Sequence, residues 1–193
     1  MQKILIVSSK NLLSQPFEGA QKRILDISKF LSKKNQIVFV GKLNPSKGYD
    51  IYRDAIIKIL NEYPDWKAYS IGDEKRNKPT INHKNHVELG YLSHKEVLEF
   101  LCKTEIAVVP SRWEEPFGRT SLEASANGCA VIISNKGGLP ETVTNAVILK
   151  KLDVKTLVNE IENLIYNHKF RKYLQKSSHK NFYLKHLSLI HIS

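Results

Sequence analysis

Short apolar runs bounded by turn residues alternate with segments of helical periodicity along most of this chain. Buried strands of a parallel sheet are apolar on both faces, and the helices that connect them cover those faces. The pattern therefore predicts an α/β fold, in which a doubly wound parallel sheet has helices on both faces. The expected strands are Ile4–Val7, Ile37–Val40, Ala68–Ile71, His86–Leu89, Ile106–Val109 and Ala130–Ile133, and the clearest expected helices lie at about 19–34, 51–60, 97–101 and 157–165.

The length and the charge of the chain limit what it can be. Its 193 residues suffice for one domain of ordinary size and a fraction of a second. The formal net charge of +11 favours anionic partners, such as phosphate-bearing small molecules, anionic lipid or nucleic acid. A hydrophobic content of 41% excludes wholesale disorder, and no apolar run approaches the ~18 residues that cross a membrane.

The cysteines, the histidines and the first residues exclude further classes. Cys102 and Cys129 lie within apolar segments, which favours buried free thiols over a disulfide. The histidines have no metal-ligand spacing with the cysteines, so no metal site is expected. The apolar run at Ile4–Val7 is shorter than the core of a signal peptide, which makes a cytoplasmic location the expectation.

The segment 110–124 carries the most chemical information. It follows an expected strand and leads into an expected helix, and ligands of open α/β sheets bind at such junctions. Gly118 allows the backbone to approach a ligand closely. The amides of Gly118, Arg119 and Thr120 stand at the start of the helix, where backbone N–H groups attract phosphate.

The same segment contains two carboxylates, Glu115 and Glu123, that can accept hydrogen bonds from sugar or ribose hydroxyls. Their spacing alone is weak evidence, because Glu88 and Glu96 have the same spacing. That second pair lacks the Pro-Phe-Gly turn and the helix of small residues, so we interpret it as accidental surface charge.

Two further loops follow expected strands in the same way. Lys42 and Lys47 come after the second expected strand, where two ammonium groups can neutralise a diphosphate. No Walker frame surrounds them, and alone they would be incidental lysines on a solvated loop. Gly137 and Gly138 come after the last expected strand and allow tight backbone approach. Together, the three loops favour one site for phosphate and sugar.

These segments resemble the carboxyl-terminal, donor-binding domain of GT-B-fold retaining glycosyltransferases of family 4, the glycosyl transferases group 1. The similarity extends from about Ile37 to about Ile165. It is carried by Gly41-Lys42-Leu43, Lys47-Gly48, Leu89-Gly90-Tyr91, Val109-Pro110-Ser111, Glu115-Pro116-Phe117-Gly118, Glu123-Ala124, Gly128-Cys129-Ala130-Val131 and Gly137-Gly138-Leu139-Pro140-Glu141. The resemblance implies a Rossmann-like half of a GT-B fold. It also implies transfer of a sugar, with retention of configuration, from a nucleotide-sugar such as a UDP- or GDP-sugar to a sugar or lipid-linked acceptor, as in polysaccharide or lipopolysaccharide biosynthesis.

The resemblance also implies roles for single residues. Lys42 and Lys47 would hold the donor diphosphate and stabilise the leaving group, with Lys42 where the family more often has Arg. Glu115, which completes the implied catalytic set, would contact the donor sugar. The remaining implied donor contacts are Glu123 with the ribose hydroxyls, Leu89, Gly90 and Tyr91 near the base, and Phe117, Gly118, Arg119 and Thr120 near the sugar and phosphates.

One departure from the family and one feature that fits it bear on the mechanism that the resemblance implies. Arg119 stands where the family usually has an apolar residue, and the chain has no Asp-x-Asp motif. The missing motif fits a metal-independent enzyme that uses no cofactor, in which lysines and helix amides supply the positive charge.

Three segments are expected along the chain. Residues 1–36 resemble the first strand and helix of the family's amino-terminal acceptor domain, most of which is missing. Residues 37–168 correspond to the domain that binds the nucleotide-sugar, and residues 169–193 to a basic helix and tail with no acidic residue. A shortened or fragmentary transferase is therefore expected, and whether the isolated chain is active stays open.

Alternatives remain at two points. The chain could instead be a noncatalytic module that binds a nucleotide-sugar or a protein partner. The basic tail is compatible with a solvated helical face and with peripheral contact at the inner face of an anionic membrane, and the sequence does not choose between them. Nucleic acid is not expected as a partner, because no recognised binding motif is present.

Overall fold

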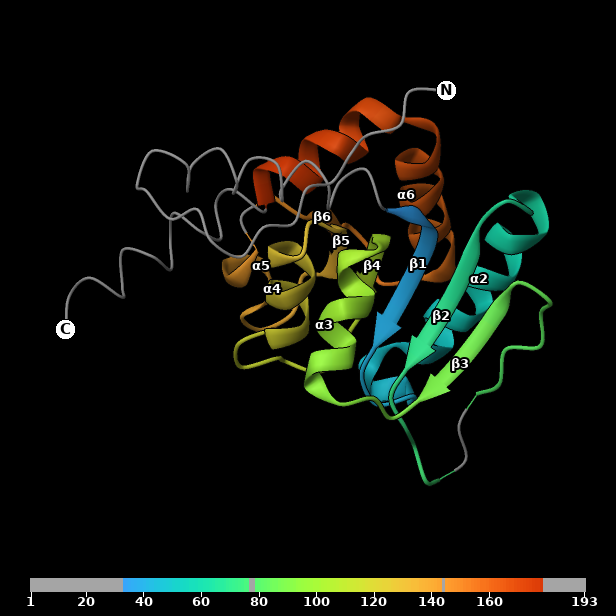
Figure 1. The fold of residues 1–193 in the computed structure, drawn as a ribbon. Coiled ribbons are helices and arrows are strands. Elements are labelled where there is room, and N and C mark those ends of the chain that lie inside the picture. Colours follow the sequence, from blue (N-terminus) through green and yellow to red (C-terminus); the bar gives the residue numbers. More distant parts are fainter. Residues whose placement is uncertain (1–32, 77–78, 144, 179–193) are drawn as a thin grey trace, which may run out of the picture. The chain divides into compact units, whose positions relative to one another are not determined.

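A six-stranded parallel sheet, in the order β3-β2-β1-β4-β5-β6, runs through the described part of the chain (Figure 1). The computed structural model describes residues 33–76, 79–143 and 145–178. The strands are Lys34–Val40 (β1), Lys67–Ile71 (β2), His86–Gly90 (β3), Thr104–Val109 (β4), Ala130–Ser134 (β5) and Val147–Leu149 (β6). The predicted α/β fold with a parallel sheet is confirmed.

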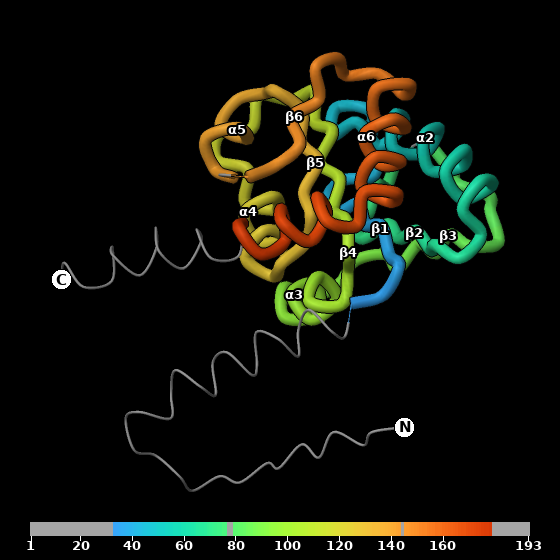
Figure 2. The backbone as a smooth tube through the Cα atoms, turned by 90° about the horizontal axis from the view of Figure 1, so that it is seen from above, coloured from blue at the N-terminus to red at the C-terminus, as the bar shows by residue number. Residues whose placement is uncertain are grey.

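Helices cover both faces of this sheet (Figure 2). They are Pro45–Lys47 (η1, a 3-10 turn), Tyr49–Glu62 (α2), His94–Cys102 (α3), Arg119–Ala126 (α4), Leu139–Thr142 (α5), Val154–Tyr166 (α6) and a further helix at residues 168–178. Helices α2 and α6 pack on one face, and α3 and α4 pack on the other. Since side chains alternate across a strand, Ile37 and Phe39 of β1 face α2 while Val38 between them faces α3.

The structure corrects the sequence prediction at several element boundaries. Strand β1 begins at Lys34, not at Ile37, so Lys34 does not belong to the helix expected at about 19–34, and residues 19–32 lie outside the described part of the chain. The polar residues at the start of β1 still pair, because the amide of Lys34 donates to the carbonyl oxygen of Lys103 at 2.9 Å. Strand β6 was not predicted, since it is only three residues long and half-exposed. The strand expected at Ile4–Val7 lies outside the described residues, and the division into three segments stays a prediction.

Glu96 is not accidental surface charge, contrary to the sequence interpretation. It is the fourth residue of a capping box at the start of α3, where its carboxylate accepts from the amide of Ser93 at 2.8 Å. The hydroxyl of Ser93 in turn accepts from the amide of Glu96. The two residues thereby satisfy backbone N–H groups that a helix start leaves without a partner.

Both cysteines are free thiols, as predicted, but only one is fully buried. Cys129, the residue before β5, is buried, and burial raises the pKa of its thiol to about 11. Cys102 at the end of α3 is half-buried and donates to the side-chain oxygen of Asn127. Among the described residues, no helix combines the length and the apolar character needed to cross a bilayer.

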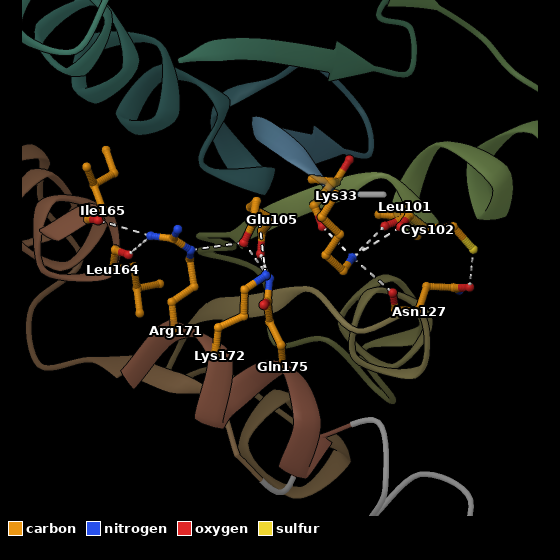
Figure 3. A network of polar contacts seen from close by, with 11 residues as sticks. Lys33, Leu101, Cys102, Glu105, Asn127, Leu164, Ile165, Arg171, Lys172 and Gln175 are labelled. Carbon is orange, nitrogen blue, oxygen red and sulfur yellow. Dashed lines mark hydrogen bonds and ion pairs between the residues drawn. The ribbon is translucent and has the colours of Figure 1, made fainter. Parts of the chain in front are cut away.

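The partly buried ammonium group of Lys33, just before β1, bonds the ends of α3 and α4 and the start of β4 (Figure 3). Lys33 Nζ donates to the carbonyl oxygens of Thr104 at 2.6 Å, Asn127 at 3.2 Å and Cys102 at 3.3 Å. The last carbonyls of a helix carry partial negative charge, so a cation there is favourable. Burial nevertheless lowers the pKa of Lys33.

A buried carboxylate anchors the helix at residues 168–178 (Figure 3). Glu105 of β4 accepts from Arg171 Nε at 2.9 Å and from Gln175 Nε2 at 2.8 Å, and Lys172 Nζ lies 3.3 Å from its other oxygen. Arg171 also donates to the carbonyl of Leu164. Burial acts to raise the pKa of Glu105, but the charges of Lys172 and Arg171 outweigh it and lower that pKa.

We predict that Glu105→Gln lowers the free energy of unfolding by about 3–5 kcal/mol, because it leaves a buried guanidinium without its counter-charge. The pKa of Glu105 is lower in the folded chain, so its stabilising effect is fully present above the usual carboxyl pKa, begins to decline below that value and is lost as the pH falls through the folded pKa. Urea denaturation at pH 7 and at pH 4 measures both effects. The difference between variant and wild type should shrink at the lower pH.

The matched control is Glu99→Gln, which changes an exposed carboxylate on α3. It should change the free energy of unfolding by less than about 0.5 kcal/mol. Equal losses in the two variants would show that the buried pair does not anchor the helix.

Candidate functional site

The candidate site lies at the carboxyl ends of β1 and β4, the neighbouring strands between which the strand order reverses. In open α/β sheets this switch point is where ligands bind, because the connections on either side diverge there. The loop at residues 41–48 follows β1 and the loop at residues 110–118 follows β4. Together they hold most of the residues that the sequence singled out.

An ion pair links these two loops. Lys47 Nζ lies 2.5 Å from Glu115 Oε1, and the hydroxyl of Ser111 donates to the same oxygen at 2.9 Å. Both charged side chains are mostly covered, with 30% of Lys47 and 16% of Glu115 exposed. A partly covered pair is less screened by solvent than one on an open surface, so the two groups hold each other in place.

The loop that carries Lys47 is clamped to the loop after β4. Arg112 donates to both carboxylate oxygens of Asp50, at 2.6 and 2.8 Å, and to the carbonyl of Pro45 at 2.5 Å. Partial burial acts to raise the pKa of Asp50, but the hydrogen bonds and charge of Arg112 outweigh it and lower that pKa. A bidentate pair fixes orientation as well as distance, so Arg112 sets the position of η1.

Gly48 allows the two loops to approach this closely. Its φ of 73° is left-handed, and a Cβ at this position would lie 2.7 Å from the carbonyl carbon of Pro110. Any other residue would push the β1 loop away from the β4 loop.

The third predicted loop, at residues 134–138, supports the backbone of Glu115 from below. The amide of Gly138 donates to the carbonyl of Glu115 at 2.7 Å. Glu114 accepts from Lys136 Nζ at 3.0 Å and from the amide of Gly137 at 2.6 Å, and these hydrogen bonds lower the pKa of Glu114. The glycine pair thus approaches protein backbone, which ties the loop after β5 to the site.

A small cavity of about 120 Å³ opens above the ion pair. Its lining includes Lys47, Ser111, Glu115, Gly118, Arg119, Thr120 and Leu139. Helix α4 begins at Arg119, and the first amides of a helix have no acceptor within it. The cavity therefore combines an ammonium group, a carboxylate and a helix start, which is a setting suited to a phosphate ester joined to a polyol.

A larger cavity of about 640 Å³ adjoins the first and shares Val40 and Gly41 with it. Its lining includes Lys42, Gly72, Asp73, Lys75, Arg76, Tyr91 and Leu92. Lys42 is exposed here, and the side chain of Tyr91 is 83% exposed. A cavity of this size, with mixed apolar and charged walls, can take a planar heterocycle.

Glu123 of α4 is held by two side chains. Arg119 Nε donates to Glu123 Oε1 at 2.7 Å, and His94 Nε2 lies 2.9 Å from the same oxygen. The sequence did not single out His94, because it lies 29 residues away in α3 and no spacing rule connects the two. Only the packing of α3 against α4 brings them together.

The structure brings the predicted site residues together in part. Lys47, Glu115, Gly118, Arg119 and Thr120 share the smaller cavity, whereas Lys42 and Tyr91 line the larger one. The predicted residues that line neither cavity are Leu89, Gly90, Phe117 and Glu123. The roles of all these residues stay predictions. Within the described ranges, no group of three or more His, Cys, Asp or Glu side chains is placed to hold a metal ion.

A parallel sheet in this strand order, with its candidate site at the switch point, defines a Rossmann-like α/β domain. The family model for glycosyl transferases group 1 matches residues 20–181. The chain therefore belongs to the glycosyl transferases group 1.

Relatives and solved structures agree with this membership. The chain is 34% identical to the uncharacterized glycosyltransferase MJ1178 of Methanocaldococcus jannaschii, over 88% of this chain and 52% of that protein. It is similar in fold to the C-terminal domain of the glycosyl transferase group 1 protein LpcC of Francisella tularensis, with a TM-score of 0.67, 21% identity, and 86% and 92% of the two chains covered. It is also similar in fold to Anabaena HepE in complex with UDP, with a TM-score of 0.69, 18% identity, and 89% and 49% covered.

The chain spans about half or less of the curated relatives that it matches. It covers 32%, 46% and 52% of three of them. The LpcC structure, in contrast, is a C-terminal domain and is covered almost completely. The described residues thus correspond in fold to a C-terminal domain of the glycosyl transferases group 1.

We predict that Gly137→Ala destabilises the fold more than Gly90→Ala does. Both glycines have positive φ, 53° and 67°, so each variant loses about 1–2 kcal/mol from backbone strain. A Cβ at Gly137 would also lie 2.5 Å from the amide nitrogen of Glu115, whereas one at Gly90 meets nothing within 4 Å. That overlap should add about 1–3 kcal/mol.

Urea denaturation of the two variants measures the difference directly, because the strain from φ is common to both. Equal midpoints for the two variants would contradict the close approach of the glycine loop to Glu115.

Proposed function

We propose that this chain is the donor-binding part of a retaining, metal-independent glycosyltransferase of family 4, and that it binds a nucleotide-sugar at the carboxyl edge of the sheet. The observation that carries the proposal is the contact between Lys47 and Glu115 in the cavity at the start of α4. It places a group suited to phosphate 2.5 Å from a group suited to sugar hydroxyls. Membership of the glycosyl transferases group 1 supports it.

The diphosphate of the donor would lie between Lys47 and the first amides of α4. Lys47, Arg119 and Thr120 all line the smaller cavity, and the amides at the start of a helix would be the N–H donors to a phosphate there. Lys42 lines the adjoining cavity and would approach from the base side. In the transfer, the bond between the sugar's anomeric carbon and the phosphate oxygen breaks, the oxygen of the acceptor hydroxyl bonds to that carbon, and the hydroxyl proton passes to the departing phosphate oxygen. Fixed positive charge would stabilise the departing diphosphate without a metal ion.

The sugar of the donor would lie against Glu115. Lys47 and Ser111 both bond Oε1, which leaves Oε2 of the carboxylate to accept a sugar hydroxyl. Since the backbone of Glu115 is held by Gly138, the position of this acceptor is set before the donor arrives. Such preorganisation reduces the ordering that binding requires.

The base would occupy the larger cavity beside Tyr91, with the ribose between the two cavities near Glu123. The complexes of Anabaena HepE with UDP and with UDP-glucose make uridine nucleotides the first ligands to test. The acceptor would be bound mainly by the other half of a complete enzyme. Transfer therefore depends on a second domain that brings the acceptor into line, since positioning supplies much of the rate.

We predict that Lys47→Ala weakens binding of a UDP- or GDP-sugar to this chain at least about tenfold, because a charge-assisted bond to the diphosphate is lost. Isothermal titration calorimetry with UDP-glucose and GDP-mannose measures the affinity. The same variant should bind the free nucleosides uridine and guanosine as the wild type does, since those lack phosphate.

Lys58→Ala provides the matched control, because Lys58 is an exposed lysine on α2 that lines neither cavity. Its affinity should equal that of the wild type. No heat with any nucleotide-sugar, or equal affinities in the two variants, would overturn the proposed site.

A further inference from the structure

Arg119, Glu123 and His94 form a cluster that the proposed function leaves unexplained. The guanidinium Nε of Arg119 and the ring Nε2 of His94 both point to Glu123 Oε1, at 2.7 and 2.9 Å. The Glu123 side chain is 21% exposed, while those of Arg119 and His94 are 71% and 55% exposed. The carboxylate is therefore the covered member of the cluster, with two more exposed donors on one of its oxygens.

The stability of α4 does not account for an arginine at this position. Arg119 is the first residue of the helix, where the macrodipole disfavours a cation. A basic residue four positions before an acidic one is also the weaker orientation of such a pair. Helix formation alone thus favours another residue at position 119. The reason for an arginine must lie in what its side chain holds.

The geometry defines which atom of Glu123 remains available. A carboxylate oxygen only accepts, so the 2.9 Å contact places a hydrogen on His94 Nε2, which then donates. Oε1 is occupied by two donors from different helices, α3 and α4. The two donors hold Oε1 in place, and Oε2 is the oxygen that a further donor can use.

The two partners of Glu123 relate the cluster to the cavities, although Glu123 itself lines neither of them. Arg119 lines the smaller one, beside Lys47 and Thr120. His94 follows Leu92 by two residues, and Leu92 lines the larger cavity. A ligand with a diphosphate in the smaller cavity and a base in the larger one has its ribose between them. Glu123, on the helix whose first residue lines the smaller cavity, is the carboxylate that we assign to this ribose.

We propose that Arg119 is a positioning residue which, together with His94, fixes the carboxylate of Glu123 to accept from the ribose hydroxyls. The pair thereby makes the site select ribonucleotides over deoxyribonucleotides. This inference rests on the proposed function, because it assumes that a nucleotide occupies the two cavities. It goes further in assigning a task to the arginine that stands in place of the family's usual apolar residue, and to a histidine from another helix.

The test compares UDP with 2′-deoxy-UDP and 3′-deoxy-UDP, and GDP with its 2′-deoxy and 3′-deoxy counterparts, by calorimetry on the full chain. The wild type should prefer the ribonucleotide over at least one deoxy form by about tenfold or more, since one bond to a charged acceptor is lost. In Arg119→Leu this preference should fall to about twofold, because the acceptor is no longer fixed. Arg119→Lys should restore part of it.

The ratio of the affinities for the ribonucleotide and the deoxyribonucleotide separates positioning from other roles of Arg119. A loss of fold would weaken every nucleotide equally and would appear in the circular dichroism spectrum. Direct binding of the diphosphate by Arg119 would weaken the ribo and deoxy forms equally, and either result would overturn the inference. Arg53→Leu is the matched control, because Arg53 is ion-paired on α2 and lines neither cavity, and its ratio should equal that of the wild type.

The same titrations separate this inference from the proposed function. If the wild type binds neither UDP nor GDP, both the proposed function and the positioning role of Arg119 are wrong. If it binds one of them but Arg119→Leu keeps the full preference for the ribonucleotide, only the positioning role falls.

Discussion

The contact between Lys47 and Glu115 is the interaction on which the site depends. It joins the loops that follow β1 and β4, the two strands between which the strand order reverses. An ammonium and a carboxylate would not stay 2.5 Å apart on two independent loops. They do so here because each loop is held by others. Arg112 and Gly48 fix the loop of Lys47, and the glycine loop after β5 fixes the backbone of Glu115. The geometry of one ion pair is thus set by contacts from three strands.

Much of the fold could be predicted from the sequence, because a parallel sheet requires strands that are apolar on both faces, and such runs are visible. The short strand β6 could not, since three half-exposed residues carry little pattern. The start of β1 could not either, because Lys34 joins the sheet through its backbone, which the side chain does not reveal. The role of Glu96 could have been predicted, because Ser93 and Glu96 have the spacing of a capping box. The spacing between glutamates does not reveal it.

The candidate site divides in the same way. The loops could be found because each follows a strand, and parallel strands deliver their carboxyl ends to one edge. What the sequence cannot show is which side chain meets which across that edge. Lys47 and Glu115 are 68 residues apart and His94 and Glu123 are 29 apart, so each pair exists only through the register of the sheet and the packing of α3 on α4. Gly137 and Gly138 show the same limit of sequence reasoning. The sequence predicts that backbone comes close to them, but only the structure shows that it is the backbone at Glu115.

The positively charged residues fall into two groups: those paired within the fold and those that face the two cavities. Lys33 bonds the carbonyl ends of two helices, and Arg171 and Lys172 share the carboxylate of Glu105, so these cations serve the fold. Arg112 is paired with Asp50 and positions a loop. Net charge therefore overstates what is available to a ligand. Because a phosphate responds to the local field and not to the total, the few cations that face the two cavities, and not the formal +11, decide what this domain can bind.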